Sequence, residues 1–245
     1  MGGHGNDRYP PAEEPGLNFL NNVLIFPGAD IFFLHNEICA DDYVYARENE
    51  RRHEYATSWS VYQDEVVPAF ERLEQEGLIA AWGITAVSVP DMIVSAIGAQ
   101  TPPQVVQAVA NLLDSPGDLT RFDGPARTRD IIAAAKRQGA GVMGIRAVQA
   151  GALTKAFDRP SDPANPNTLD YARAAPFRDL CGKWGEDPAF VAHRYALGVA
   201  GVDTLVLGVK NRDELRTALA AEAAGPLEPE QLGAIEALGL RQTAN

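Results

Sequence analysis

The residue that most directly suggests chemistry is His35, the last residue of the run DIFFLH at positions 30–35. Continuous apolar runs of this length are typical of strands buried on both faces of a parallel sheet. In a parallel barrel, the reacting groups gather at the carboxyl ends of the strands. An imidazole there can donate a hydrogen bond to a carbonyl oxygen or relay a proton. A histidine that merely caps a buried strand would occupy the same position, so both interpretations stand.

Acidic residues and a cysteine follow His35 closely, namely Glu37, Cys39, Asp41 and Asp42. A single histidine among hard and soft ligands matches no common metal-ligand spacing, so we predict no metal site. Glu37 and Asp41 are instead the acid–base candidates of a different hypothesis, an unrelated phosphate-binding barrel enzyme.

A second candidate site lies in LVLGVKNRDELR, residues 205–216, where Gly208, Lys210 and Arg212 separate a predicted strand from a helix N-terminus. Unpaired N–H groups and the helix dipole attract phosphate, and a nearby cation adds to this attraction. Phosphate sites in barrels often occupy the loops after strands seven and eight. The alternative is an ordinary capped helix with basic surface residues, and we favour the anion site.

Three glycines, Gly139, Gly141 and Gly144, formally spell GxGxxG. A dinucleotide fingerprint needs its glycines after a strand and at the start of a helix, whereas these follow a helix and lead into a strand. We therefore interpret Gly139 as a helix cap and predict no Rossmann site. The chain also contains no GxxxxGK[ST] motif, which excludes a P-loop.

Short apolar runs alternate with helical patterns and supply the elements that must position these groups. Helix followed by strand, without hairpin signals, predicts parallel βα units. The expected fold is therefore α/β, a parallel (β/α) sheet of the TIM-barrel type that is incomplete and has about five or six strands. The predicted strands are residues 30–35, 78–85, 105–109, 142–148 and 202–209, with a weak sixth at 23–26.

The helices carry recognisable start and stop signals. Val66, Val67, Phe70 and Leu73 share one helical face, and Gly77 supplies a left-handed C-terminal cap. Asp187 before Pro188 is a typical helix start. Further helices are predicted at RTRDIIAAAKRQG, after Asn211 and over residues 228–238.

Three segments lack such patterns. Residues 1–16 mix glycine, proline and charge, which predicts an unstructured terminus before a single domain over 17–245. Residues 36–61 form a long charged and aromatic connection of the kind that faces substrates. Residues 158–169, rich in proline and asparagine, are predicted to be irregular.

Composition excludes several classes of protein. The net charge of −12 without a basic cluster argues against binding to nucleic acid or to an anionic membrane surface. The apolar runs are far shorter than the ~20 residues that span a bilayer, and no secretion signal is evident, so we expect a cytoplasmic protein. Cys39 and Cys181 have no CxxC spacing and are expected to be free thiols.

The order of several segments along residues 30–219 resembles the aldo-keto reductase family. In chain order these segments are DIFFLH, GLIAAWGIT, QAVANLL, AVQAGALT and AHRYAL with VDTLVLGVKNRDEL. That family folds as an eight-stranded (β/α) barrel and moves a hydride between NADPH and a carbonyl carbon. The order of the segments resembles strands four to eight of the barrel, which implies that this chain is N-terminally incomplete.

The resemblance assigns roles to individual residues. His35 matches the histidine that orients the substrate carbonyl. Gln107 and Thr85 match residues that bind the nicotinamide carboxamide, and Asn111 lies in the asparagine position just after them. Arg146 follows the position where the family often carries an aromatic ring on nicotinamide, and a guanidinium can lie flat on a ring. The adenosine phosphate is assigned to Gly208, Lys210, Asn211 and Arg212.

The chain also departs from the family pattern. Ala86 replaces the family asparagine after Thr85, and Ile145 stands at the aromatic position. The family aspartate, tyrosine and lysine of the first three βα units have no counterparts: only Tyr9 precedes His35, and the first lysine is Lys136. Since that tyrosine protonates the forming alkoxide, its loss should reduce the rate by about 10² to 10⁴.

The function implied by the resemblance is NADP(H)-dependent reduction of a small-molecule carbonyl to an alcohol, with doubtful activity for this chain alone. The alternative is a non-catalytic remnant that binds nucleotide or a partner subunit. Five strands cannot close a barrel, so the sheet would have two unpaired edges through which the chain could dimerise.

Overall fold

A parallel sheet forms the centre of the computed structural model, which describes residues 28–158 and 162–242. Its five strands follow the order β1-β4-β5-β6-β7, and every neighbouring pair is parallel. Successive strands along the chain are thus neighbours in space. A second, two-stranded parallel sheet joins β2 (Glu37–Cys39) to β3 (Ala56–Ser58). The strands of the main sheet are β1 (Ala29–Leu34), β4 (Ile79–Thr85), β5 (Val105–Val109), β6 (Gly141–Ile145) and β7 (Thr204–Leu205).

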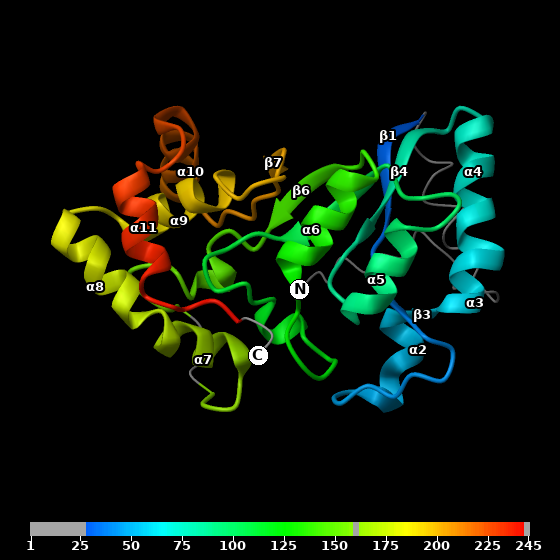
Figure 1. The fold of residues 1–245 in the computed structure, drawn as a ribbon, viewed down its shortest axis with the longest axis horizontal. Helices are drawn as coiled ribbons and strands as arrows, with labels where there is room; N and C mark the ends of the chain where they lie inside the picture. The colour runs from blue at the N-terminus through cyan, green and yellow to red at the C-terminus, as the bar shows by residue number, and fades with distance from the viewer. Residues whose placement is uncertain (1–27, 159–161, 243–245) are drawn as a thin grey trace, which may run out of the picture.

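Helices flank the sheet, with α2 to α5 towards one end of the molecule and α7 to α11 towards the other (Figure 1). The helices are α2 (Arg52–Tyr55), α3 (Trp59–Val61), α4 (Val67–Gln75), α5 (Pro90–Ile97), α6 (Thr128–Arg137), α7 (Pro166–Arg173), α8 (Ala175–Trp184), α9 (Pro188–Leu197), α10 (Arg212–Ala224) and α11 (Pro229–Glu236). Short turns are η1 (Asn49–Arg51), η3 (Gly117–Leu119) and η4 (Gln149–Gly151), and a π-helical turn, η2 (Tyr62–Val66), joins α3 to α4.

The hydrophobic core lies between the sheet and its helices. Trp82 of β4 is buried and stacks on Phe70 of α4, with ring centroids 5.0 Å apart. Leu73 on the same face of α4 is also buried, and Gly77 follows the helix with φ +71°. The predicted helical face and its C-terminal cap are therefore confirmed.

The predicted helix starts are also present. Asp187 accepts hydrogen bonds from the backbone N–H groups of Ala189 (2.8 Å) and Phe190 (3.3 Å) at the start of α9. Asn211 caps α10 in the same way, accepting from Asp213 N at 3.0 Å and Glu214 N at 2.9 Å. Both side chains satisfy amides that the helix itself leaves unpaired.

The three glycines that spell GxGxxG occupy the positions expected of them. Gly139 follows α6 with φ +77°, and Gly141 opens β6. A Cβ on Gly144 would lie 2.6 Å from the Leu205 side chain and 2.9 Å from Ala110 Cβ. These glycines end a helix and allow close packing against a strand, and they do not start a helix.

Among the described residues the sheet does not close into a ring. β1 pairs only with β4, and β7 pairs only with β6. The expectation of an incomplete parallel α/β barrel sheet with about five strands is confirmed. Residues 1–16 and the weak strand prediction at 23–26 lie outside the described residues.

Two predicted strands are too long. The run at 202–209 forms a strand only at Thr204–Leu205, because β6 ends at Ile145 and no described strand pairs with the far edge of β7. The run at 142–148 ends at Ile145, because Arg146 adopts a left-handed conformation with φ +62° that a strand cannot continue.

Two segments taken as irregular contain regular structure. Residues 36–61 include β2 and β3, because Ile38 and Cys39 are fully buried and thus need paired backbone groups. Residues 158–169 include the start of α7, where Asn165 accepts a hydrogen bond from Asn167 N at 2.8 Å and Pro166 fills the first helical position. In this segment the helix cap at Asn165 starts a helix although the segment is rich in proline.

Replacing Gly83 of β4 by alanine should destabilise the chain by about 1–3 kcal/mol. The added Cβ would lie 2.4 Å from the carbonyl oxygen of Val105 and 2.6 Å from the Phe33 ring, and the backbone neighbour cannot move aside. The control is Gly182→Ala in α8, where a Cβ meets nothing within 4 Å; this change should stabilise the helix by about 0.5–1 kcal/mol. Urea unfolding of both variants measures the difference, and equal midpoints would contradict the packing described here.

Candidate functional site

Three predicted site residues form one hydrogen-bonded group. His35 Nδ1 lies 2.8 Å from the Thr85 hydroxyl, and that hydroxyl donates to Gln107 Oε1 at 3.2 Å. His35 comes directly after β1, Thr85 ends β4 and Gln107 lies on β5. The group therefore crosses the three adjacent strands near their carboxyl ends, where barrel enzymes place reacting groups.

The strand register brings the three side chains together. Phe33 pairs with Gly83 and Thr85 pairs with Gln107, so residues fifty and twenty-two positions apart in sequence become neighbours. Thr85 is buried, Gln107 is half-buried and His35 is exposed. The buried hydroxyl thus has two hydrogen-bond partners, and the imidazole remains accessible.

Asn111 is near this group in sequence but is committed to the backbone. Its side chain is fully buried and donates to the carbonyls of Ser115 (3.0 Å) and Arg146 (3.1 Å). Its Oδ1 accepts from the N–H groups of Leu113 and Ser115. Asn111 therefore fastens the loop after β5 to the end of β6 and has no hydrogen-bonding capacity left for a ligand.

The Arg146 side chain takes part in a different set of contacts. Its guanidinium pairs with Asp118 at 2.7 Å and donates to Asn167 Oδ1 at 3.4 Å. None of its hydrogen bonds reaches the group formed by His35, Thr85 and Gln107. A role for Arg146 against nicotinamide stays a prediction.

The predicted phosphate residues lie together at the start of α10. The Lys210 ammonium contacts Asp158 and lies 3.4 Å from Glu214, while Asn211 caps the helix. Arg212 is exposed and has no hydrogen-bond partner among the described residues. Gly208 has open space where a Cβ would be. No hydrogen bond joins this segment to the group around Thr85, so the structure shows two separate clusters of predicted residues.

Glu37, a buried acid two positions after His35 in the sequence, was predicted only as an acid–base candidate of an alternative hypothesis. Glu37 Oε1 accepts a hydrogen bond from Arg121 at 2.7 Å, while its Oε2 is buried without a partner. Burial raises the pKa of Glu37 to about 7, and the nearby Arg121 only partly offsets this. Arg121 also pairs with Glu48 at 2.8 Å and stacks on the Tyr55 ring at 4.3 Å.

A second buried network was not predicted at all. Asp170 of α7 accepts hydrogen bonds from Ser115 (2.6 Å), Gln149 (2.7 Å) and Arg173 (2.8 Å). It joins the loops after β5 and β6 to α7. Gln149 and the following Ala150 adopt left-handed backbone conformations with φ +46° and +51°. No short sequence motif signals a network of this kind, because its members are up to 55 positions apart.

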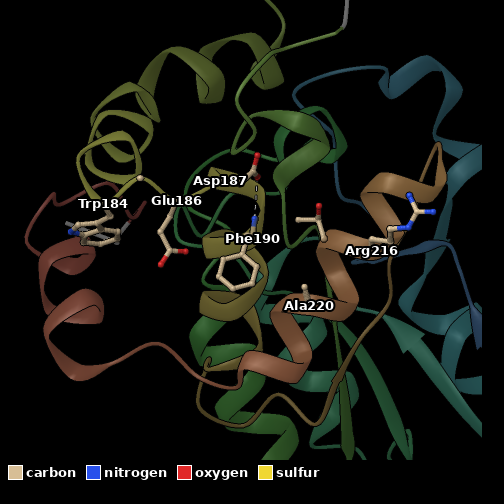
Figure 2. A pocket seen from close by; sticks show the side chains of 8 residues that line it. Trp184, Glu186, Asp187, Phe190, Arg216 and Ala220 are labelled. Atoms are coloured by element: carbon tan, nitrogen blue, oxygen red, sulfur yellow. Dashed lines mark hydrogen bonds between the residues drawn. The ribbon is translucent and has the colours of Figure 1, made fainter.

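The cavity in Figure 2 lies away from these residues. It measures about 530 Å³ and is lined by α8, α9 and α10, with Trp184, Glu186 and Asp187 near Phe190, Arg216 and Ala220. None of the predicted site residues lines it. The cavity is a broad depression between helices and is not the candidate site.

The described residues contain no group of three or more His, Cys, Asp or Glu side chains suited to a metal ion. Cys39 and Cys181 are free thiols, as expected, and both are buried. In the described part of the chain, no helix has the length and apolar character needed to cross a membrane.

A model of the aldo-keto reductase family matches residues 28–239. The chain belongs to the aldo-keto reductase family. It is similar in structure to an aldo-keto reductase of Bacillus halodurans. The apo form gives a TM-score of 0.64 at 19% identity and covers 91% of this chain and 66% of the other. The holo form gives 0.63 at 20% identity, covering 88% and 60%.

Identities this low show a shared fold, and this chain spans 60–66% of the length of that protein in its two forms. A comparison with curated proteins gave no match. The match of the family model to residues 28–239 and the order of the strands agree with the expected parallel sheet of an aldo-keto reductase barrel.

The raised pKa of Glu37 predicts how stability changes with pH. The folded state holds a proton up to about pH 7 that the unfolded chain loses near its ordinary pKa of 4.5. Stability should therefore fall by roughly 3 kcal/mol as pH rises from about 4.5 to 7. Glu37→Gln, which cannot ionise, should remove this slope.

The matched control is Glu48→Gln, because Glu48 binds the same Arg121 from an exposed position. It should keep the wild-type slope. Urea unfolding at several pH values measures all three proteins. If Glu37→Gln retains the slope, the buried carboxyl is not the group responsible.

Proposed function

We propose that this protein is an oxidoreductase that binds NADPH and reduces a small-molecule carbonyl to an alcohol. The observation that carries the proposal is the hydrogen-bonded group of His35, Thr85 and Gln107 across three adjacent strand ends. Membership of the aldo-keto reductase family supports it. We also propose a cytoplasmic location, where free thiols such as those of Cys39 and Cys181 are kept reduced.

The nicotinamide end of the site fits the cofactor. Gln107 Oε1 is used by Thr85, and Gln107 Nε2 has no partner among the described residues, so it can donate to a carboxamide oxygen. His35 presents an accessible ring at the same strand ends and would orient the substrate carbonyl. When bound, NADPH supplies the hydride, and the chain supplies binding, orientation and proton handling.

The phosphate end fits in part. Arg212 is exposed at a helix N-terminus, which suits an anion. Lys210 already contacts two carboxylates, Asp158 and Glu214, which a phosphate would have to displace. Arg212 is thus the residue that should favour NADPH over NADH. We also assign Arg146 to the nicotinamide region.

The second candidate function is a non-catalytic chain that binds nucleotide or a partner subunit. It is favoured by the outer edges of β1 and β7, which pair with no further strand among residues 28–158 and 162–242 and through which two copies could pair.

Arg212→Gln should weaken NADPH binding about tenfold or more and leave NADH binding unchanged, because only NADPH carries the additional phosphate. The control is Arg216→Gln, one turn further along α10, where the arginine pairs with Asp213 at 2.5 Å. It should change neither affinity. Fluorescence titration measures both cofactors, and an equal loss for both would argue against a phosphate site at Arg212.

Steady-state reduction of a simple aldehyde separates the two functions. If the chain is an enzyme, turnover should be detectable with NADPH as the hydride donor. His35→Ala should abolish it while NADPH still binds. NADPH binding without turnover in the wild-type chain would support the non-catalytic function, and no binding at millimolar cofactor would reject both.

A further inference from the structure

The hydrogen bond between Thr85 and Gln107 determines which nitrogen of His35 carries a proton. A threonine hydroxyl has one proton to donate and can accept with its lone pairs. Thr85 donates its proton to Gln107 Oε1 at 3.2 Å. At its contact with His35 Nδ1, 2.8 Å away, the hydroxyl can then only accept. With the Gln107 amide oriented so that Oε1 faces Thr85, His35 Nδ1 is the protonated nitrogen.

The other ring nitrogen is left for the substrate. In a neutral imidazole with a proton on Nδ1, Nε2 carries a lone pair and cannot donate. His35 is exposed, and Nε2 has no hydrogen-bond partner among the described residues. A neutral His35 would thus accept a proton from an alcohol, and only the doubly protonated ring could donate to a carbonyl oxygen.

We propose that His35 is the acid–base residue of this chain through Nε2, and that Thr85 and Gln107 are positioning residues that fix its tautomer. The inference rests on the proposed function for its catalytic part. It differs from the orienting role that the resemblance assigns to His35, because a ring that only orients a carbonyl would carry its proton on Nε2.

The proton balance of the step is complete. In the direction of oxidation, the alcohol O–H bond breaks and its proton goes to His35 Nε2, while the carbon-bound hydrogen leaves as hydride to the oxidised nicotinamide cofactor and the C=O bond forms. The imidazolium then releases a proton to water. Reduction is the reverse: the carbonyl carbon gains the hydride, the oxygen gains the Nε2 proton and the neutral ring is reprotonated by solvent.

Among the described residues, no other side chain forms a hydrogen bond with the His35 ring that could set its tautomer. Its only hydrogen bond with a described residue is to Thr85, an uncharged side chain. Glu37, the nearest acid in sequence, is engaged by Arg121. The Tyr45 and Tyr62 hydroxyls are buried without partners, and Tyr195 is bound to Glu236. In the described residues, no tyrosine hydroxyl is hydrogen-bonded to the ring.

The tautomer can be read without cofactor by long-range ¹H–¹⁵N NMR of the histidine rings, at a pH high enough to deprotonate them. The chain has four histidines, and His35→Gln identifies the signal. We expect the Nδ1-protonated form in the wild type. Thr85→Val, which keeps the shape and removes the hydroxyl, should shift His35 towards the Nε2-protonated form, and Thr85→Ser should restore the wild-type pattern.

His53→Gln, at an exposed position, is the control and should leave the His35 signal unchanged. Backbone amide spectra of each variant establish that it folds. An Nε2-protonated ring in the wild type, or a tautomer that Thr85→Val does not change, overturns the proposal.

Alcohol oxidation tests the catalytic part. Glutamine at position 35 can still form hydrogen bonds but cannot exchange a proton, so His35→Gln should lower kcat by about 10² to 10⁴ with little change in KM. An orienting role alone predicts a much smaller loss of kcat. NADP binding without any wild-type turnover overturns the acid–base role, whereas failure to bind NADP rejects the proposed function itself and leaves the NMR result to decide the tautomer.

Discussion

The parallel pairing of β1, β4 and β5 is the constraint on which the candidate site depends. A parallel ladder aligns strands in the same direction, so all their carboxyl ends reach one edge of the sheet. The register then decides which side chains meet there. It places Thr85 beside Gln107 and within reach of His35, three residues that the chain supplies from separate βα units. A shift of one residue in either pairing would turn these side chains to opposite faces.

Polar networks around the site hold the loops that follow these strands. Asn111 and Asp170 form hydrogen bonds with loop backbone groups and neighbouring side chains. Their role is therefore to hold the structure and not to take part in the reaction. Among the described site residues, the exposed side chains that could bind a ligand without breaking an ion pair include the His35 ring at one cluster and the Arg212 guanidinium at the other. This division between satisfied buried groups and accessible exposed groups is what separates candidate site residues from scaffold residues here.

Sequence patterns predicted the elements whose signals are local. The helix face of Phe70 and Leu73, the cap at Asp187 and the strand before His35 are all readable within a few residues, and all are present. The strand predicted at 202–209 was too long because strand formation also needs a partner, which no local pattern reports. Thr85 and Gln107 were found through resemblance, but the hydrogen bonds that Thr85 forms with Gln107 and with His35 depend on register. The Asp170 network and the role of Arg121 arise from contacts between distant segments, so no local pattern could reveal them.

Arg121 joins parts of the chain that are far apart in sequence. Its guanidinium bonds Glu37 and Glu48 and covers the Tyr55 ring, and its carbonyl accepts a hydrogen bond from Arg47 N at 3.3 Å. Opening of the loop after β5 must break all of these contacts at once. The segments after β1 and β5 should therefore exchange their amide hydrogens as one cooperative unit, although more than seventy residues separate Glu48 from Arg121.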